Sequence, residues 1–177
     1  MQRRQYLSLS GLALTTGLAG CTAPDAAPST PAEQVVSVTA TNDSDRTLVF
    51  TVAVVAAGFG GLRLTEPDGE EKTFPDAETV EDVPNEAWER AVTFTPLGPH
   101  QRQEFRSTSG SGRGIEFDSA APGSTVVVTI AAPDETPPLR SISAGACGTA
   151  ARAEIAVRVD AGGVVSHSTT CTDAAAE

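Results

Sequence analysis

The sequence has few of the residues on which catalytic and nucleic-acid-binding proteins depend. Among its 177 residues there is one lysine, Lys72, one methionine, Met1, and two histidines, His100 and His167. Phosphate recognition needs clustered Lys and Arg side chains, so this acidic chain is not expected to bind nucleic acid. A blue-copper site needs two histidines, a cysteine and usually a methionine, so copper is not expected either.

Recognisable catalytic and nucleotide-binding motifs are also missing. Ser111 stands between two glycines, but the pattern lacks the strand, turn and helix that surround a hydrolase nucleophile. The glycines at 110, 112 and 114 do not follow a dinucleotide-binding fingerprint. We therefore predict no enzyme activity, no cofactor and no metal, and interpret both histidines as structural or exposed side chains.

No apolar run reaches the roughly 20 residues that a membrane-spanning helix needs. Residues 1–20 have instead the layout of an export signal, with Arg3 and Arg4 before a weakly apolar stretch that ends in small residues. Tyr6 and Leu7 follow the two arginines closely. This spacing resembles a twin-arginine export signal.

Residues 18–21, Leu-Ala-Gly-Cys, resemble a lipobox. The resemblance implies that Cys21 carries a diacylglycerol and that the chain is cut just before it; an ordinary cleaved signal is the alternative. The lipidated cysteine and the proline- and alanine-rich stretch after it, together residues 21–32, are predicted to form a tether, because this composition cannot pack a core. The expected location is the extracytoplasmic face of the membrane.

Acidic residues outnumber basic ones by 23 to 12, which gives a net charge of −11. Loss of Arg3 and Arg4 with the signal would leave −13. Such acidity with a single lysine resembles the proteins of salt-loving archaea, in which carboxylates hold water and cations while salt screens their repulsion. The acids between residues 76 and 89 lack the spacing of a calcium-binding loop and are interpreted as solvated surface.

From Gln34 onward, apolar residues recur with the period of two that is typical of strands. The nearly continuous apolar run at 48–55 predicts a strand buried on both faces or central in a sheet. Asn85 is expected to cap a short helical turn at 85–90. Turns or loops are expected at 42–45, 66–69, 107–114 and 161–163, and further strands at 36–40, 59–65, 72–74, 91–95, 101–106, 115–117, 124–131, 139–144, 155–159 and 164–170.

Many short strands with almost no helix predict an all-β fold, an antiparallel β-sandwich over residues 33–172 followed by a frayed tail at 173–177. The strands on either side of the turn at 42–45 are similar to the opening hairpin of immunoglobulin-like domains in archaeal surface proteins. This resemblance implies an immunoglobulin-like sandwich. Trp88 precedes both Cys147 and Cys171, so the antibody arrangement, with tryptophan between the cysteines, is not expected.

Cys147 and Cys171 are the two cysteines that remain after Cys21. In an oxidising compartment such a pair predicts a disulfide; metal ligation or free thiols are the alternatives. Closing a loop of about 25 residues would stabilise the fold by about 3.5 kcal/mol on the chain-entropy model.

The residues as a whole favour a non-catalytic binding or structural module of the cell envelope, a monomer whose partner is a surface protein or a glycan. The alternative is a solute-binding or enzymatic module with a site built from loops. Asn42-Asp43-Ser44 is a glycosylation sequon on a predicted turn, which makes Asn42 a candidate for an exposed N-glycan.

The charge balance predicts a strong dependence of stability on salt. Carboxylates that repel one another in dilute buffer are screened at high ionic strength, so the melting temperature should rise as KCl is raised into the molar range. Thermal unfolding followed by circular dichroism measures this directly. A melting temperature that stays flat from low to multimolar salt would contradict the halophilic interpretation.

Overall fold

The computed structural model describes residues 33–133, 140–145, 147–148 and 150–173. The predicted signal, Cys21 and the tether lie outside these residues. The described part contains one short 3-10 helix, η1 (Val80–Asp82), and one α-helix, α1 (Asn85–Arg90). None of its helices is long and apolar enough to cross a membrane. Its strands are β1 (Gln34–Asn42), β2 (Leu48–Val55), β3 (Leu62–Thr65), β4 (Glu71–Phe74), β5 (Thr93–Pro96), β6 (His100–Ser107), β7 (Ser111–Ala120), β8 (Thr125–Ala131), β9 (Arg140–Ala144), β10 (Arg152–Val159) and β11 (Val165–Thr172).

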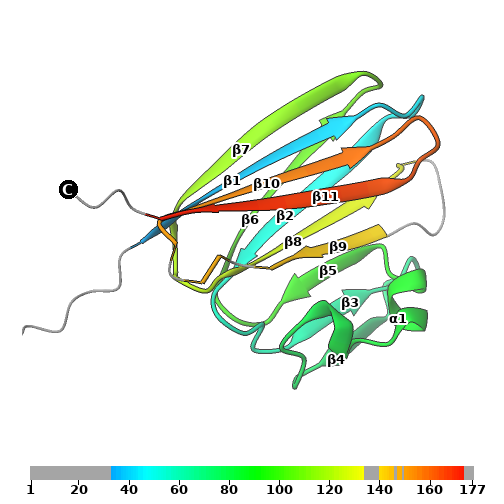
Figure 1. The fold of residues 1–177 in the computed structure, drawn as a ribbon. Coiled ribbons are helices and arrows are strands. Elements are labelled where there is room, and N and C mark those ends of the chain that lie inside the picture. The colour runs from blue at the N-terminus through cyan, green and yellow to red at the C-terminus, as the bar shows by residue number, and fades with distance from the viewer. Residues whose placement is uncertain (1–32, 134–139, 146, 149, 174–177) are drawn as a thin grey trace, which may run out of the picture. The chain divides into compact units, whose positions relative to one another are not determined.

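Two four-stranded sheets pack face to face, in the orders β11-β10-β1-β7 and β6-β2-β8-β9 (Figure 1). Alternate residues of each sheet meet in one hydrophobic core, as the period of two requires. The predicted all-β sandwich is therefore confirmed. The core is made of aliphatic and aromatic side chains, among them Val36, Val38, Phe50, Val52, Phe105, Phe117, Val128, Ile130, Ile155 and Val157.

β1 and β2 do not form the predicted opening hairpin. β1 pairs in parallel with β10 and antiparallel with β7, whereas β2 lies in the other sheet between β6 and β8. The connection at 43–47 therefore crosses from one sheet to the other. Each strand carries its own inward apolar face, and the crossing buries the two faces against each other in one core. The likeness to an immunoglobulin-like opening hairpin was wrong in this respect.

Residues 107–114 are not the loop that their Ser and Gly content predicted. β7 begins at Ser111, and only 108–110 make the turn, with Gly110 at φ 71°. Gly112 lies opposite Thr41 in the ladder, and a Cβ there would come within 3.3 Å of the Ala40 carbonyl oxygen. The glycine marks a close approach of two backbones within a sheet, not a flexible loop.

A third sheet, in the order β4-β3-β5, and α1 form an insertion between β2 and β6. The insertion has its own core, to which β2 contributes Ala53 and Val55 and β8 contributes Val127. β2 is thus buried on both faces, as the apolar run at 48–55 predicted, and β8 is buried on both faces as well. The rest of this second core comes from the insertion itself: Phe59, Leu62, Leu64, Ala77, Val80, Val83, Ala87, Trp88, Ala91 and Phe94.

The acidic stretch at 76–89 was expected to be a long solvated connection, but it supplies part of this second core. Trp88 is buried, and its indole Nε1 donates a hydrogen bond of 3.1 Å to the Val80 carbonyl oxygen. α1 starts at Asn85 itself after Pro84, and no side chain caps it. The prediction that Asn85 is the cap was wrong, because proline already sets the backbone at the start of the helix.

The predicted disulfide between Cys147 and Cys171 is confirmed. The two Cα atoms are 5.5 Å apart, and the bridge joins β11 to the segment that follows β9. It therefore links the two sheets along one side of the sandwich, where β11 and β9 are the edge strands.

Candidate functional site

The sandwich has two distinct ends, which β1 connects. At the entry end, Gln34 lies beside Ala120, and the chain enters the fold there. At the far end, Asn42 lies beside Val159 and Ser111. With about 3.3 Å per residue, the two ends of β1 are about 26 Å apart.

Asn42 organises the far end through four hydrogen bonds. Its Nδ2 donates to the carbonyl oxygens of Arg46 and Ser107, at 2.8 and 2.9 Å. Its Oδ1 accepts from the backbone N–H of Ser44 at 3.1 Å and from the Ser44 hydroxyl at 2.6 Å. The amide uses both donors and both acceptor positions, so one buried side chain joins β1, the crossing at 43–47 and the end of β6.

The exposure that the glycosylation sequon required is not observed. The Asn42 side chain is fully buried, and its Nδ2 donates to two carbonyl oxygens, one of which would lose its donor if a glycan replaced a hydrogen on this atom. The prediction of an exposed asparagine was wrong. The physical reason is that an asparagine in a turn can also be buried, with its side chain bonded to nearby backbone groups.

Beside Asn42, the far end holds a cavity of about 230 Å³ between the two sheets. Aliphatic side chains of both sheets line part of it, and the polar β1–β2 crossing and β10–β11 turn line the rest. It is smaller than the roughly 300–1,000 Å³ of most small-molecule sites and suits a single apolar side chain. The lining residues are Ser44, Asp45, Arg46, Leu48, Ile130, Ala132, Val159, Ala161, Gly162, Gly163 and Val165.

The cavity lining contains no histidine or cysteine among the described residues. The Ser44 hydroxyl donates to Asn42 Oδ1, so no base is placed to activate it. The Asp45 carboxylate lies 3.8 Å from Arg46 Nε at an exposed position. The arrangement can hold an apolar group and offer polar contacts at the rim, but it has no activated nucleophile.

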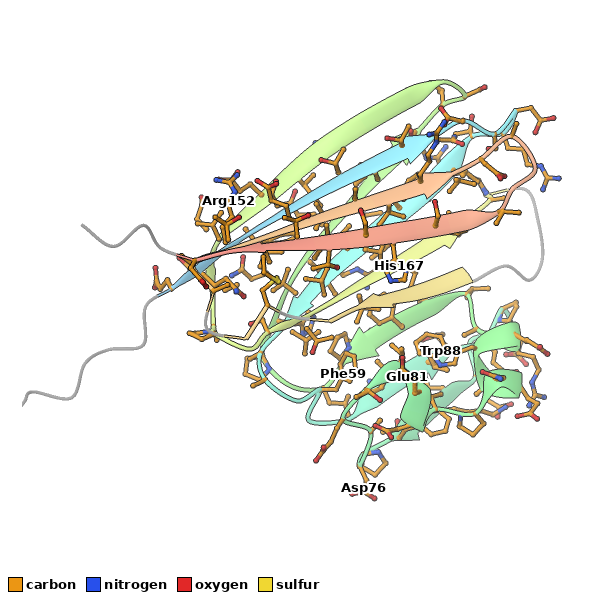
Figure 2. All side chains as sticks on the ribbon, viewed as in Figure 1. Phe59, Asp76, Glu81, Trp88, Arg152 and His167 are labelled. Atoms are coloured by element: carbon orange, nitrogen blue, oxygen red, sulfur yellow. A yellow bond between two sulfur atoms is a disulfide. The ribbon has the colours of Figure 1, made fainter. Side chains whose placement is uncertain are left out.

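The three residues weighed for catalysis lie far apart in the fold. His100 begins β6 at the entry end, and its Nδ1 is 2.9 Å from the Gly98 carbonyl oxygen. Ser111 begins β7 at the far end, and its hydroxyl donates to the Thr108 carbonyl oxygen at 2.6 Å. His167 is exposed on β11, at the other edge of the sandwich (Figure 2). They form no common site.

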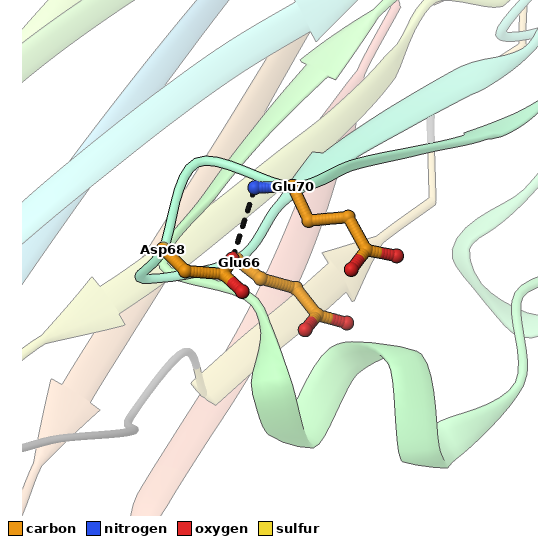
Figure 3. Close-up of side chains that lie close together, drawn as sticks. All are labelled: Glu66, Asp68 and Glu70. Atoms are coloured by element: carbon orange, nitrogen blue, oxygen red, sulfur yellow. Dashed lines mark hydrogen bonds between the residues drawn. The ribbon is translucent and has the colours of Figure 1, made fainter.

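Sequence reasoning missed one cluster of acids, Glu66, Asp68 and Glu70, which was interpreted only as a turn. One carboxylate oxygen of each lies within 4.8 Å of the others (Figure 3). Lys72 Nζ already pairs with Glu66, Arg90 Nε lies 3.7 Å from it, and Asp68 accepts a bond from the Glu70 N–H. The cluster is thus a charge-compensated hairpin turn.

Asp82 illustrates how the insertion uses its acids locally. The backbone N–H of Thr79 is the main cause that lowers the pKa of Asp82 below its usual value, followed by the Glu78 N–H and the Thr79 hydroxyl. A lowered pKa means that this capping contribution is present above the ordinary pKa and is lost as pH falls through the lowered one. The carboxylate fixes the start of η1.

No family model matches the chain, and no curated protein matches it. Among solved structures it is similar to the type VI secretion lipoprotein TssJ1 from Pseudomonas aeruginosa, with 10% identity and a TM-score of 0.45 over 78% of this chain and 97% of that one. It is also similar to the membrane-binding domain of pneumolysin, with 8% identity and a TM-score of 0.37 over 80% of this chain and all of that one.

The cytotoxin suilysin from Streptococcus suis matches with 8% identity and a TM-score of 0.37 over 80% of this chain. The chain spans about a quarter of the length of the whole toxins that it matches, 24% in the case of suilysin. With TM-scores below 0.5, these likenesses assign the chain to no family.

The far end depends on Asn42, which leads to a testable stability change. Asn42→Asp puts a carboxylate next to the Arg46 and Ser107 carbonyl oxygens, and we expect a loss of about 2–4 kcal/mol in the free energy of unfolding. Urea unfolding followed by circular dichroism measures it. Asn85→Asp is the matched control, since Asn85 is exposed in the first turn of α1 and should change stability by less than about 0.5 kcal/mol. Equal effects of the two substitutions would contradict this account of Asn42.

Proposed function

We propose that this protein is a lipid-anchored, extracytoplasmic, non-catalytic binding module that presents the far end of its sandwich to a partner. One observation carries the proposal: the chain enters at Gln34, and a cavity lined by both sheets lies at the opposite end of β1, beside Asn42. A second hollow, of about 260 Å³ around Pro99 and Ala121, lies at the entry end, where the chain itself arrives. An anchor attached through residues 21–32 would pull on the entry end. The far end would then be the end free to meet another molecule.

The nature of the cavity supports a protein partner more than a small solute. A volume of about 230 Å³, lined partly by aliphatic side chains of both sheets and partly by polar groups, has room for one side chain of a partner, and such pockets hold the residues that dominate many protein interfaces. The exposed carboxylate of Asp45 can make polar contacts at the rim. A solute-binding module is the second candidate, favoured only by the same cavity.

The anchor is tested at Cys21. Cys21→Ser removes the thiol that would carry the lipid, so the protein should leave the membrane fraction or accumulate as uncut precursor. Fractionation of cells and the mass of the N-terminal peptide measure this. Thr22→Ala, a neighbouring change that keeps the cysteine, should stay membrane-bound. Membrane attachment of Cys21→Ser with no lipid mass on the wild-type peptide would overturn the anchor.

The presenting end is tested with a photo-cross-linking residue at one of two exposed alanines. Ala161 stands at the far end, on the rim of the cavity, and Ala121 follows β7 at the entry end. In native envelope at high salt, we expect a discrete cross-linked product from position 161 and none from position 121. The reverse pattern, or equal products from both positions, would contradict presentation of the far end.

A further inference from the structure

β11 is an unprotected edge strand. Edge strands normally carry charges or proline that prevent further pairing. Its eight residues, Val165–Thr172, include no Lys, Arg, Asp, Glu or Pro. Each of the other five edge strands has at least one: Arg113 in β7, Arg102 in β6, Arg140 in β9, Lys72 in β4 and Pro96 in β5.

The backbone bonds around β10 show which groups of β11 face outward. The N–H groups of Val35 and Asp43 in and after β1 bond to the carbonyl oxygens of Ala151 and Val159, so odd-numbered residues of β10 face β1. The Asp160 N–H bonds to the Val164 carbonyl oxygen at 3.0 Å, so even-numbered residues face β11. The register then pairs even residues with even residues.

The odd-numbered residues of β11 therefore point their backbone N–H and C=O groups at the free edge. These residues are Val165, His167, Thr169 and Cys171. Their N–H groups have no hydrogen-bond acceptor among the described residues. From Ser166 to Thr172 every side chain is exposed, and Val164, just before the strand, is 62% exposed. Among the described residues no strand pairs with this edge, and the Cys147–Cys171 bridge holds its C-terminal end to the segment after β9.

We propose that β11 is a self-pairing interface: two copies of this chain join antiparallel along β11, about a two-fold axis at Ser168. This register pairs Val165 with Cys171 of the second copy and His167 with Thr169. Every free pair of N–H and C=O groups then finds a partner, for about eight hydrogen bonds. The β11-β10-β1-β7 sheets of the two copies then form one continuous sheet of eight strands.

The self-complementary register favours a second copy as the occupant, because it leaves no outward backbone group of either β11 unpaired. The chain has a net charge of −11, so two copies repel each other over most of their surfaces and can meet only where carboxylates are absent. β11 brings none, and Ser166 would face Thr170 of the other copy, a cross-strand pair whose hydroxyls can hydrogen-bond. This proposal replaces the monomer expected from the sequence, and it is independent of the lipid anchor.

The test uses the full chain carrying Cys21→Ser in multimolar KCl. Ser168→Cys puts two thiols opposite each other in a non-hydrogen-bonded pair, where the Cα atoms are about 4.5 Å apart, so mild oxidation should give a covalent dimer. Thr39→Cys is the matched control, because Thr39 is exposed on the central strand β1 of the same sheet and should give no more dimer than random collision.

Sedimentation equilibrium gives a second measurement that needs no new cysteine. Ser168→Asp puts like charges opposite each other on the axis and should weaken dimerisation about fivefold, whereas Thr39→Asp should leave it unchanged. Circular dichroism of each variant checks the fold. A wild-type chain that remains monomeric at millimolar concentration overturns the proposal. So does Ser168→Cys that cross-links no better than Thr39→Cys; the edge would then be left for a strand of another protein.

Discussion

The two-sided burial of β2 is the constraint on which the rest of the structure depends. Phe50, Val52 and Val54 face the core between the two sheets, and Ala53 and Val55 face the core of the insertion. Each fully buried valine stabilises the fold by about 1.5–3 kcal/mol relative to an exposed one. Without the insertion, the outward face of β2 would be an apolar surface in water. The third sheet and α1 are thus an integral layer of the domain.

This layering covers the outer face of only one of the two sheets. One face of the β6-β2-β8-β9 sheet carries the insertion, and the other faces the core. The far end, fixed by Asn42, and the open edge at β11 remain as surfaces with distinct chemistry. The first is a small cavity lined by aliphatic side chains and polar groups, and the second is a row of outward-facing backbone groups.

The strand periods predicted the sandwich and the burial of β2 on both faces, because both depend on local pattern, and the pair of cysteines in an expected oxidising compartment predicted the Cys147–Cys171 bridge. Which strands pair with one another was not predictable from local pattern. The crossing between β1 and β2, for example, depends on which sheet each strand joins. The burial of Trp88 was not predicted, because it lies in an acidic segment whose apolar residues are separated by exposed carboxylates. The prediction that Asn42 is exposed was wrong because a glycosylation sequon and a buried turn asparagine can have the same sequence. The four hydrogen bonds of the side chain distinguish the two cases.

One measurement tests most directly whether β2 joins both cores into a single cooperative domain. Trp88 is the only tryptophan and lies in the second core, so its fluorescence reports on the insertion, while far-UV circular dichroism is dominated by the sandwich strands. Urea unfolding followed by both signals should give coincident transitions. An earlier fluorescence transition, with the circular dichroism signal still folded, would show an insertion that unfolds on its own and would contradict the account.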